Sequence, residues 1–409
     1  MIHVHKTTAR GRMKYAVISG QRFADLAEKE LGQMLNGIEF EKKIQRNGTS
    51  LFLITAAKTE GDVCEKVMRK TAFVDFMMQI DFTLKGKGCS YENLQDKIAC
   101  VLAGKNKESA TFKIETKRFD PVFEENAKSI EVKLGTGLER KGFVADLAKS
   151  DIIVYLVFIA DSIIAGHAIA SLRSNYALDK FRGINSSEQN KVNRAEFKLE
   201  EAVEFFGIDL KKVNAALDIG AAPGGWTHYL TDSGVKVVAI DNAFLDYRKL
   251  CANKENKTLV ITDRNNTQET KKAIEKFGVK NQVAIKSFDD KSAELSEYGL
   301  IHIKSNFPVR NFDMKKKLGT FDMLTIDANT QAVESSNIAN DFAGLLKSGA
   351  VLILTIKFGT RNFERHIETA KKALKGKYGS IRIKKLPHNR REATLFAVRK
   401  NGDADTVDE

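Results

Sequence analysis

Four charged residues stand beside strongly apolar segments of this chain, where an ionised side chain is costly unless it serves a purpose. Lys357 follows the most apolar run of the chain, Asp327 follows a second such run, and Glu392 precedes a third. Lys198 lies upstream of these three residues. A lysine accepts a proton near neutral pH only if burial or a second cation lowers its pKa, whereas a nearby carboxylate fixes its position. Two lysines and two carboxylates at strand ends could therefore remove a proton from a hydroxyl group.

The elements that would position these residues begin with an apolar run at 215–219. Small residues from Gly220 to Gly225 interrupt the run, and an apolar pattern with helical spacing begins at Trp226. This predicts a strand, a tight turn and a helix whose N-terminal N–H groups face a ligand. The next apolar run ends at Asp241, about 20 residues beyond the turn, where a carboxylate suits the two ribose hydroxyls of a nucleoside cofactor.

The turn has a specific sequence. Residues 217–226 read Leu-Asp-Ile-Gly-Ala-Ala-Pro-Gly-Gly-Trp and closely resemble the S-adenosylmethionine loop of the FtsJ-like ribose 2′-O-methyltransferases. The resemblance implies S-adenosyl-L-methionine as cofactor and no metal. Where the family usually has an aspartate that contacts the adenine, this chain has Asn306, whose amide can still bond to the adenine edge. The implied cofactor-binding residues are Asp218, Gly220, Ala221, Ala222, Pro223, Gly224, Gly225, Trp226, Asp241, Asn306 and Asp327.

The four charged residues also resemble, position by position, the Lys-Asp-Lys-Glu catalytic set of the same family. The resemblance implies that Lys357 accepts the proton of a ribose 2′-hydroxyl and that Asp327 orients Lys357 near the sulfonium. Lys198 would lower the pKa of Lys357 and contact the target phosphate or oxygen. Glu392 would position Lys198 or the ribose.

The composition favours a polyanionic partner. The chain has 409 residues, a formal net charge of +13 and a pI near 9.3, which favours nucleic acid over a membrane surface. No apolar run is long enough to cross a membrane, and the N-terminus has no apolar signal-peptide core. The four cysteines include no C-x-x-C pair, which argues against a zinc site, and this cysteine usage fits a reducing cytoplasm.

The first half of the chain has the sequence patterns of two further domains. Residues 1–82 show the order β-α-β-β-α-β of a ferredoxin-like domain. The next segments are Phe112-Lys113-Ile114 with Lys117-Arg118, Gly135, which is expected to end a helix, Val144-Ala145-Asp146-Leu147 and Asp151-Ile152-Ile153-Val154. With these segments, residues 85–170 resemble a THUMP domain, an RNA-binding module. A THUMP-type domain fused to an FtsJ-like methyltransferase resembles the architecture of ribosomal RNA enzymes of the RlmM type. We therefore expect an α/β protein with a ferredoxin-like domain at 1–82, a THUMP domain at 83–170, a linker at 171–190, a doubly wound Rossmann-fold methyltransferase domain at 191–400 and an acidic tail at 401–409.

The THUMP resemblance implies a structured RNA partner, with tRNA favoured and ribosomal RNA possible. Basic residues of that domain and of the expected active edge are the candidates for phosphate contacts. They are Lys113, Lys117, Arg118, Lys133, Arg140, Lys141, Arg194, Lys384, Arg390 and Arg391.

Other functions fit the residues less well. A base N-methyltransferase of the THUMP class carries an Asn/Asp-Pro-Pro-aromatic loop, and none of the four prolines of this chain are adjacent. A cytosine-5 enzyme needs a cysteine nucleophile near the strand that ends at Asp327, and no cysteine is there. Two alternatives remain, a ribosomal RNA 2′-O-methyltransferase and a non-catalytic RNA-binding protein of the same fold.

Overall fold

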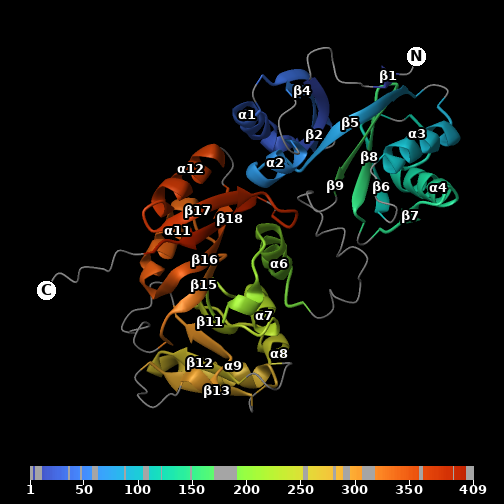
Figure 1. Cartoon of the computed structure of the whole chain (residues 1–409). Helices are drawn as coiled ribbons and strands as arrows, with labels where there is room; N and C mark the ends of the chain where they lie inside the picture. Colours follow the sequence, from blue (N-terminus) through green and yellow to red (C-terminus); the bar gives the residue numbers. More distant parts are fainter. Residues whose placement is uncertain are drawn as a thin grey trace. The chain divides into compact units, whose positions relative to one another are not determined.

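Two compact units make up the computed structural model of this protein, Met1–Ile184 and Asn185–Glu409 (Figure 1). Each unit is described by itself. The structure describes residues 3–4, 12–35, 37–46, 48–57, 63–86, 89–104, 110–120, 122–147, 150–169, 191–251, 257–279, 282–288, 295–305, 318–358, 363–389 and 391–401. The predicted linker 171–190 and all but the first residue of the predicted tail 401–409 lie outside these ranges.

The N-terminal unit begins with the predicted order of strands and helices, from β2 to β5. A continuous buried run in β2, alternating burial along β5 and the helical spacing of Ala24, Ala27 and Leu31 account for these elements. The elements are β1 His3–Val4, β2 Arg12–Gly20, α1 Ala24–Met34, β3 Glu39–Arg46, β4 Thr49–Ala57, α2 Val63–Lys70, β5 Phe76–Lys85, α3 Tyr91–Ala103, β6 Thr111–Arg118, α4 Ala127–Glu139, β7 Val144–Ala145, β8 Ile152–Ile159 and β9 Ser162–Ile169.

A single sheet runs through this unit in the order β3-β4-β2-β5-β9-β8-β6-β7. The predicted boundary between residues 82 and 83 falls inside β5, which pairs with β2 on one side and with β9 on the other. The two predicted N-terminal domains therefore share one sheet. Gly135 was expected to end a helix, but α4 continues through it to Glu139, because Leu134 and Leu138 keep the helix packed on the core.

The C-terminal unit alternates strands and helices, as expected for a doubly wound fold. Its elements are α6 Ala195–Phe206, β10 Ala215–Ile219, α7 Gly225–Asp232, β11 Lys236–Asp241, α8 Tyr247–Leu250, β12 Thr258–Thr262, α9 Thr267–Lys276, β13 Val283–Ser287, β14 Leu300–Lys304, β15 Phe321–Ile326, α11 Ala332–Asp341, β16 Leu346–Lys357, α12 Phe363–Leu374, β17 Tyr378–Lys384 and β18 Glu392–Arg399. Strands β12 and β13 come from the stretch 246–298, which the sequence pattern left unassigned.

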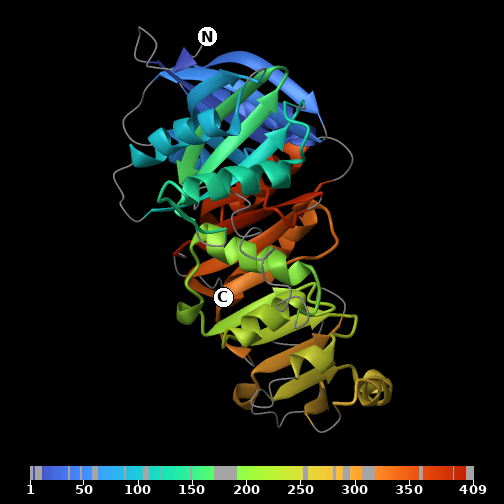
Figure 2. The same cartoon turned by 90° about the vertical axis from the view of Figure 1, so that its right-hand side faces the viewer.

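These strands form a nine-stranded sheet in the order β13-β12-β14-β11-β10-β15-β16-β18-β17. Figure 2 shows the sheet with β12 and β13 at one end and the red C-terminal strands at the other. All pairings from β13 to β16 are parallel, and β18 runs antiparallel to both of its neighbours. Helices α6 and α7 pack on one face and α11 and α12 on the other (Figure 1).

Strand β10 is the point at which the strand order reverses. It pairs with β11 on one side and with β15 on the other. In open α/β sheets, ligands bind beyond the carboxyl ends of the strands at such a point. The described residues contain no helix that combines the length and apolarity needed to cross a membrane.

Candidate active site

The turn between β10 and α7 depends on glycine at two positions. Gly220 has a φ of 73°, and a Cβ there would lie 2.8 Å from the Cα of Ala328. Gly224 has a φ of 110° and directly precedes α7. Both positions lie in the left-handed region that disfavours side chains. The turn therefore brings bare backbone and the N-terminus of α7 to the carboxyl end of β10.

Asp241 ties this turn to the end of β11. Its Oδ2 accepts a hydrogen bond from the N–H of Ala222 at 3.0 Å, and its Oδ1 accepts one from the N–H of Ala243 at 2.8 Å. The carboxylate is half-buried and keeps lone pairs for further donors. The turn offers backbone N–H donors and Asp241 offers a carboxylate that can accept hydrogen bonds from two ribose hydroxyls, so these residues fit S-adenosylmethionine.

Asp218 lies beneath the turn, contrary to its expected place among the cofactor contacts. Its side chain is buried, and its two oxygens accept hydrogen bonds from the hydroxyls of Thr227, at 2.7 Å, and Thr325, at 2.9 Å. Burial raises the pKa of Asp218 to about 6, although both hydroxyls oppose the shift. Asp218 therefore supports the turn from the core.

Trp226 also faces the core. Its ring is buried, and its Nε1–H donates a hydrogen bond to the carbonyl of Ala195 at 2.7 Å, which joins α7 to the start of α6. Of the other predicted cofactor residues, Ala221 is buried and the carbonyl of Pro223 accepts a bond from Asp246. Asn306 lies outside the described residues.

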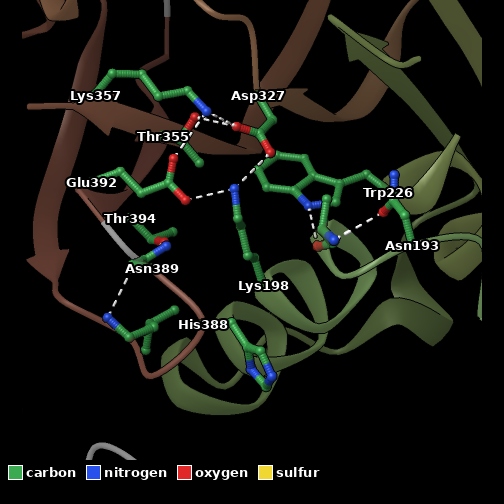
Figure 3. Close-up of polar contacts among 12 residues, drawn as sticks. Asn193, Lys198, Trp226, Asp327, Thr355, Lys357, His388, Asn389, Glu392 and Thr394 are labelled. Atoms are coloured by element: carbon green, nitrogen blue, oxygen red, sulfur yellow. Dashed lines mark hydrogen bonds and ion pairs between the residues drawn. The ribbon is translucent and has the colours of Figure 1, made fainter. Parts of the chain in front are cut away.

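The four predicted catalytic residues meet in a closed ring of ion pairs (Figure 3). The Nζ of Lys198 lies 3.2 Å from Oδ2 of Asp327 and 2.5 Å from Oε1 of Glu392. The Nζ of Lys357 lies 2.6 Å from Oδ1 of Asp327 and 2.9 Å from Oε2 of Glu392. Each lysine contacts both carboxylates, so the ring has no net charge.

Sheet register and helix packing create this ring. Lys357, the last residue of β16, is directly opposite Glu392, the first residue of β18. Asp327 follows β15, and its N–H bonds to the carbonyl of Ile219 at 3.2 Å, beside the turn. Lys198 projects from α6, whose apolar face is fixed in the core by Leu199 and other buried residues. Three neighbouring strands and one helix thus converge at one edge of the sheet.

The two carboxylates of the ring govern the pKa of Lys357. Burial lowers the pKa of Lys357, but the contacts with Asp327 and Glu392 outweigh burial and leave the pKa above its ordinary value. A contribution of Lys198 that lowers the pKa of Lys357, as expected from the sequence, therefore stays a prediction, and the two carboxylates decide the net direction in this arrangement. Lys357 is also the most accessible member, with 26% of its side chain exposed against 8% for Glu392.

A set of supporting residues was missed by the sequence analysis. The hydroxyl of Thr355 donates a bond to Oδ1 of Asp327 at 2.8 Å. His388 contacts the buried Glu201 of α6 through its ring Nδ1, at 2.6 Å, and stacks on Phe197 with ring centroids 4.9 Å apart. These contacts attach the segment that precedes Glu392 to the helix that carries Lys198. The signal available in the sequence was Glu201, a charged residue on the buried face of an amphipathic helix, which needs a polar partner.

The side chain of Asn389 also stabilises the segment that precedes Glu392. Its Oδ1 accepts bonds from the N–H of Leu386, at 2.9 Å, and from the hydroxyl of Thr394, at 3.1 Å (Figure 3). The start of β18, and with it Glu392, is therefore held by side-chain bonds as well as by the sheet.

The structure leaves only some of the predicted RNA contacts exposed. Lys113 and Lys384 are buried, Lys113 in an ion pair with Glu115 at 2.9 Å, so neither presents its charge to a surface. Arg118 donates to the carbonyls of Phe123 and Glu125 and thereby holds its own loop. Lys117 is half-buried, and Arg390 lies outside the described residues. The exposed candidates are Lys133, Arg140, Lys141, Arg194 and Arg391, of which Lys133 pairs with Glu125 and Lys141 with Asp96.

The switch-point turn, the strand-end carboxylate and the parallel sheet together define a Rossmann-like fold with a site suited to a nucleoside cofactor. Residues 191–385 match the family model of the FtsJ-like methyltransferases, so the chain carries an FtsJ-like methyltransferase domain. FtsJ-like methyltransferases use S-adenosylmethionine, which confirms the cofactor expected from the sequence.

Three curated relatives are similar to parts of this chain. An uncharacterized protein of Methanocaldococcus jannaschii, MJ1257, is 27% identical over 201 residues, which are 48% of this chain and 43% of the relative. Ribosomal RNA large subunit methyltransferase M of Pseudoalteromonas atlantica is 32% identical over 29% of this chain and 35% of its own length. Ribosomal RNA large subunit methyltransferase E of Thermoplasma acidophilum is 51% identical over 12% of this chain and 23% of its own length. The chain thus spans less than half the length of each.

Among solved structures, TrmN from Thermus thermophilus is similar at 12% sequence identity and a TM-score of 0.32, over 95% of this chain and 100% of that chain.

Proposed function

We propose that this protein is an S-adenosylmethionine-dependent RNA methyltransferase that modifies a ribose 2′-hydroxyl. The observation that carries the proposal is the ring of Lys198, Asp327, Lys357 and Glu392 beside the glycine turn. The ring contains two amines and two carboxylates. It lies next to the site that fits the methyl donor, since Asp327 is bonded through its backbone to Ile219.

The chemistry places limited demands on the protein. When bound, S-adenosylmethionine supplies a methyl group that is already activated by the sulfonium. The protein must align the 2′-oxygen behind that methyl group and remove its proton as the new bond forms. We assign the alignment to Lys198 and Glu392, whose side chains are held from both sides of the ring.

Lys357 needs a change in its contacts before it can act as a base. With both carboxylates beside it, its raised pKa keeps it an ammonium ion, which has no lone pair to accept a proton. We propose that the ribose hydroxyl replaces one carboxylate contact when RNA binds. The loss of one ion pair lets burial lower the pKa of Lys357, and the amine then accepts the 2′-hydroxyl proton.

The substrate that we propose is tRNA, and large-subunit ribosomal RNA is the second candidate. The resemblance of residues 85–170 to a THUMP domain supports tRNA. The names of the methyltransferase M and E relatives support ribosomal RNA. A net charge of +13 is consistent with either polyanion.

Methyl transfer to bulk tRNA and to ribosomal RNA tests the proposal directly. Purified protein and S-adenosylmethionine carrying a labelled methyl group should yield a ribose-methylated nucleoside after nuclease digestion. A product methylated only on the base would contradict the proposed reaction. Mapping ribose methylations in total RNA with and without the protein then identifies the substrate.

A further inference from the structure

A second basic site lies away from the ring, in a groove between helix α12 and strand β17. Figure 1 shows the two elements side by side at one edge of the C-terminal sheet. The groove has a volume of about 800 Å³. Five of its lining residues are basic and one is acidic, namely Arg365, Lys371, Lys372, Lys375 and Lys400 against Glu368.

Three of these cations are free to meet an anion. Lys371 pairs with Glu368 at 3.1 Å, and Lys400 donates to the carbonyl of Lys375 at 2.7 Å. Arg365, Lys372 and Lys375 are exposed, and within the described part of the chain none of them has an ion pair. Their spacing of seven and three residues puts them along one side of α12 and the turn that follows. The stripe is about 15 Å long at the rise of an α-helix.

The ends of α12, β16 and β18 show where the groove lies with respect to the ring. Lys357 ends β16, and the chain enters α12 shortly afterwards, so Arg365 lies at the end of α12 that follows the active edge. In the β17–β18 pairing, Tyr378 is opposite Arg399, at the far end of β18 from Glu392. The groove therefore extends from the active edge toward the opposite edge of the sheet.

We propose that this groove binds the sugar–phosphate backbone of the RNA substrate, beyond the nucleotide that is methylated. The inference rests on the proposed function and extends it to a second contact surface. Three unpaired cations in a line suit successive phosphates, because phosphate contacts add affinity and set the position of the strand without reading its sequence.

The edge strand itself argues against an added β-strand from an acidic peptide. The pairing of β17 with β18 is irregular between Gly379 and Arg382, and Ser380 has a φ of 50°. A bulge of this kind interrupts the row of N–H and C=O groups that an incoming strand needs. A polyanion held by side chains has no such requirement.

A triple charge reversal tests the groove in the full-length protein. The variant combines Arg365→Glu, Lys372→Glu and Lys375→Glu. Its matched control reverses three exposed lysines of α9, at the other end of the same sheet, by Lys271→Glu, Lys272→Glu and Lys276→Glu. A neutral triple variant, Arg365→Gln with Lys372→Gln and Lys375→Gln, guards against misfolding, and S-adenosylmethionine binding by calorimetry reports on the integrity of the fold.

The readout is binding of fluorescent bulk tRNA and of ribosomal RNA fragments over a range of salt concentrations. We expect the groove variant to bind RNA about tenfold more weakly and the salt dependence of log Kd to fall by about 2, the share of three phosphate contacts on a single strand. The neutral variant should show a smaller loss. The α9 variant should bind like the wild type, and cofactor binding should stay unchanged in all of them.

Equal affinity and equal salt dependence in the wild type and both groove variants would overturn the proposal. So would competition by polyglutamate as effective as competition by RNA at the same charge concentration, since the site would then accept any polyanion. The binding readout does not involve methyl transfer. A wild-type protein that binds RNA through the groove but methylates no ribose would therefore refute the proposed function alone.

Discussion

The two lysines of the ring differ in how far their side chains are exposed to solvent. Lys198 and Lys357 contact the same two carboxylates, yet Lys357 has the larger exposed fraction, 26% against 14%. A ribose hydroxyl that approaches from solvent therefore meets Lys357 more readily. This favours Lys357 as the group that exchanges a carboxylate for the substrate.

We predict that Lys357→Met abolishes methyl transfer while S-adenosylmethionine still binds. Loss of a positioned base lowers kcat by about 10²–10⁴-fold, whereas the cofactor contacts of the turn are untouched. Single-turnover transfer and calorimetry measure the two effects. Lys347→Met, near the other end of the same strand, is the control and should keep wild-type activity. Activity of Lys357→Met within tenfold of the wild type would remove Lys357 from this role.

Asp218 makes a pH-dependent contribution to stability. Its pKa is raised to about 6 in the folded protein by burial, whereas in the unfolded chain it has the ordinary value of 3.8. Between these two values the folded state holds a proton that the unfolded state has released. The contribution to stability is therefore complete at low pH and is lost as the pH rises toward 6, by roughly 3 kcal/mol in total.

Asp218→Asn should remove this pH dependence, because the amide does not ionise. We expect the difference in melting temperature, variant minus wild type, to rise between pH 4 and 6 and to level off above pH 6. Thermal unfolding of both proteins across this range measures the difference. A difference that does not change with pH would show that the carboxyl is not desolvated under the turn.

At the scale of elements, the glycine turn and the segment before β18 bring the donor site and the ring together. Gly220 and Gly278 offer a matched pair to separate backbone preference from close packing. Both have a φ of 73°, but a Cβ at Gly220 would lie 2.8 Å from Ala328, and a Cβ at Gly278 would meet no atom within 4 Å.

Gly278→Ala should therefore cost about 1 kcal/mol of stability and leave cofactor binding unchanged. Gly220→Ala carries the same backbone cost and must also displace Ala328, which follows Asp327 of the ring. We predict at least a tenfold loss of S-adenosylmethionine affinity for this variant alone, measured by calorimetry on protein whose fold is verified by circular dichroism. Similar affinities for the two variants would show that the close approach at Gly220 is unimportant.

On the scale of the whole molecule, the two units divide the work that we propose. The ring and the glycine turn lie entirely within Asn185–Glu409, and the region similar to a THUMP domain lies within Met1–Ile184. In our proposal, the groove along α12 adds an RNA-binding surface to the unit that holds the ring. RNA affinity should therefore be shared between the units, whereas cofactor affinity should belong to one.

We predict that residues 185–409 alone bind S-adenosylmethionine with the affinity of the full chain and bind RNA more weakly, with a residual affinity due to the groove. Phosphate contacts contribute additively to the salt dependence, so the slope of log Kd against log salt should fall and stay above zero. Calorimetry and fluorescence anisotropy measure the two affinities. Equal losses of cofactor and RNA binding would contradict the division of function.

Local patterns in the sequence were sufficient for much of this protein. Apolar runs and the small-residue turn predicted β10, α7 and β11, because strand periodicity and the backbone freedom of glycine act over a few residues. The order β-α-β-β-α-β was predicted for the same reason. The four members of the ring were identified by their positions beside apolar strands and by their resemblance to a known catalytic set.

Only the tertiary structure decided what each charge contacts. Lys198 and Asp327 are 129 residues apart in the chain, and Glu201 and His388 are 187 apart, so no local pattern reports their contacts. Burial is likewise a property of the packed molecule. It removed the side chains of Lys113, Lys384 and Asp218 from the surface. Strand pairing, which is also non-local, placed β5 across a boundary that composition had suggested. Ionisation and accessibility depend on neighbours brought together by folding, and the sequence pattern records only neighbours along the chain.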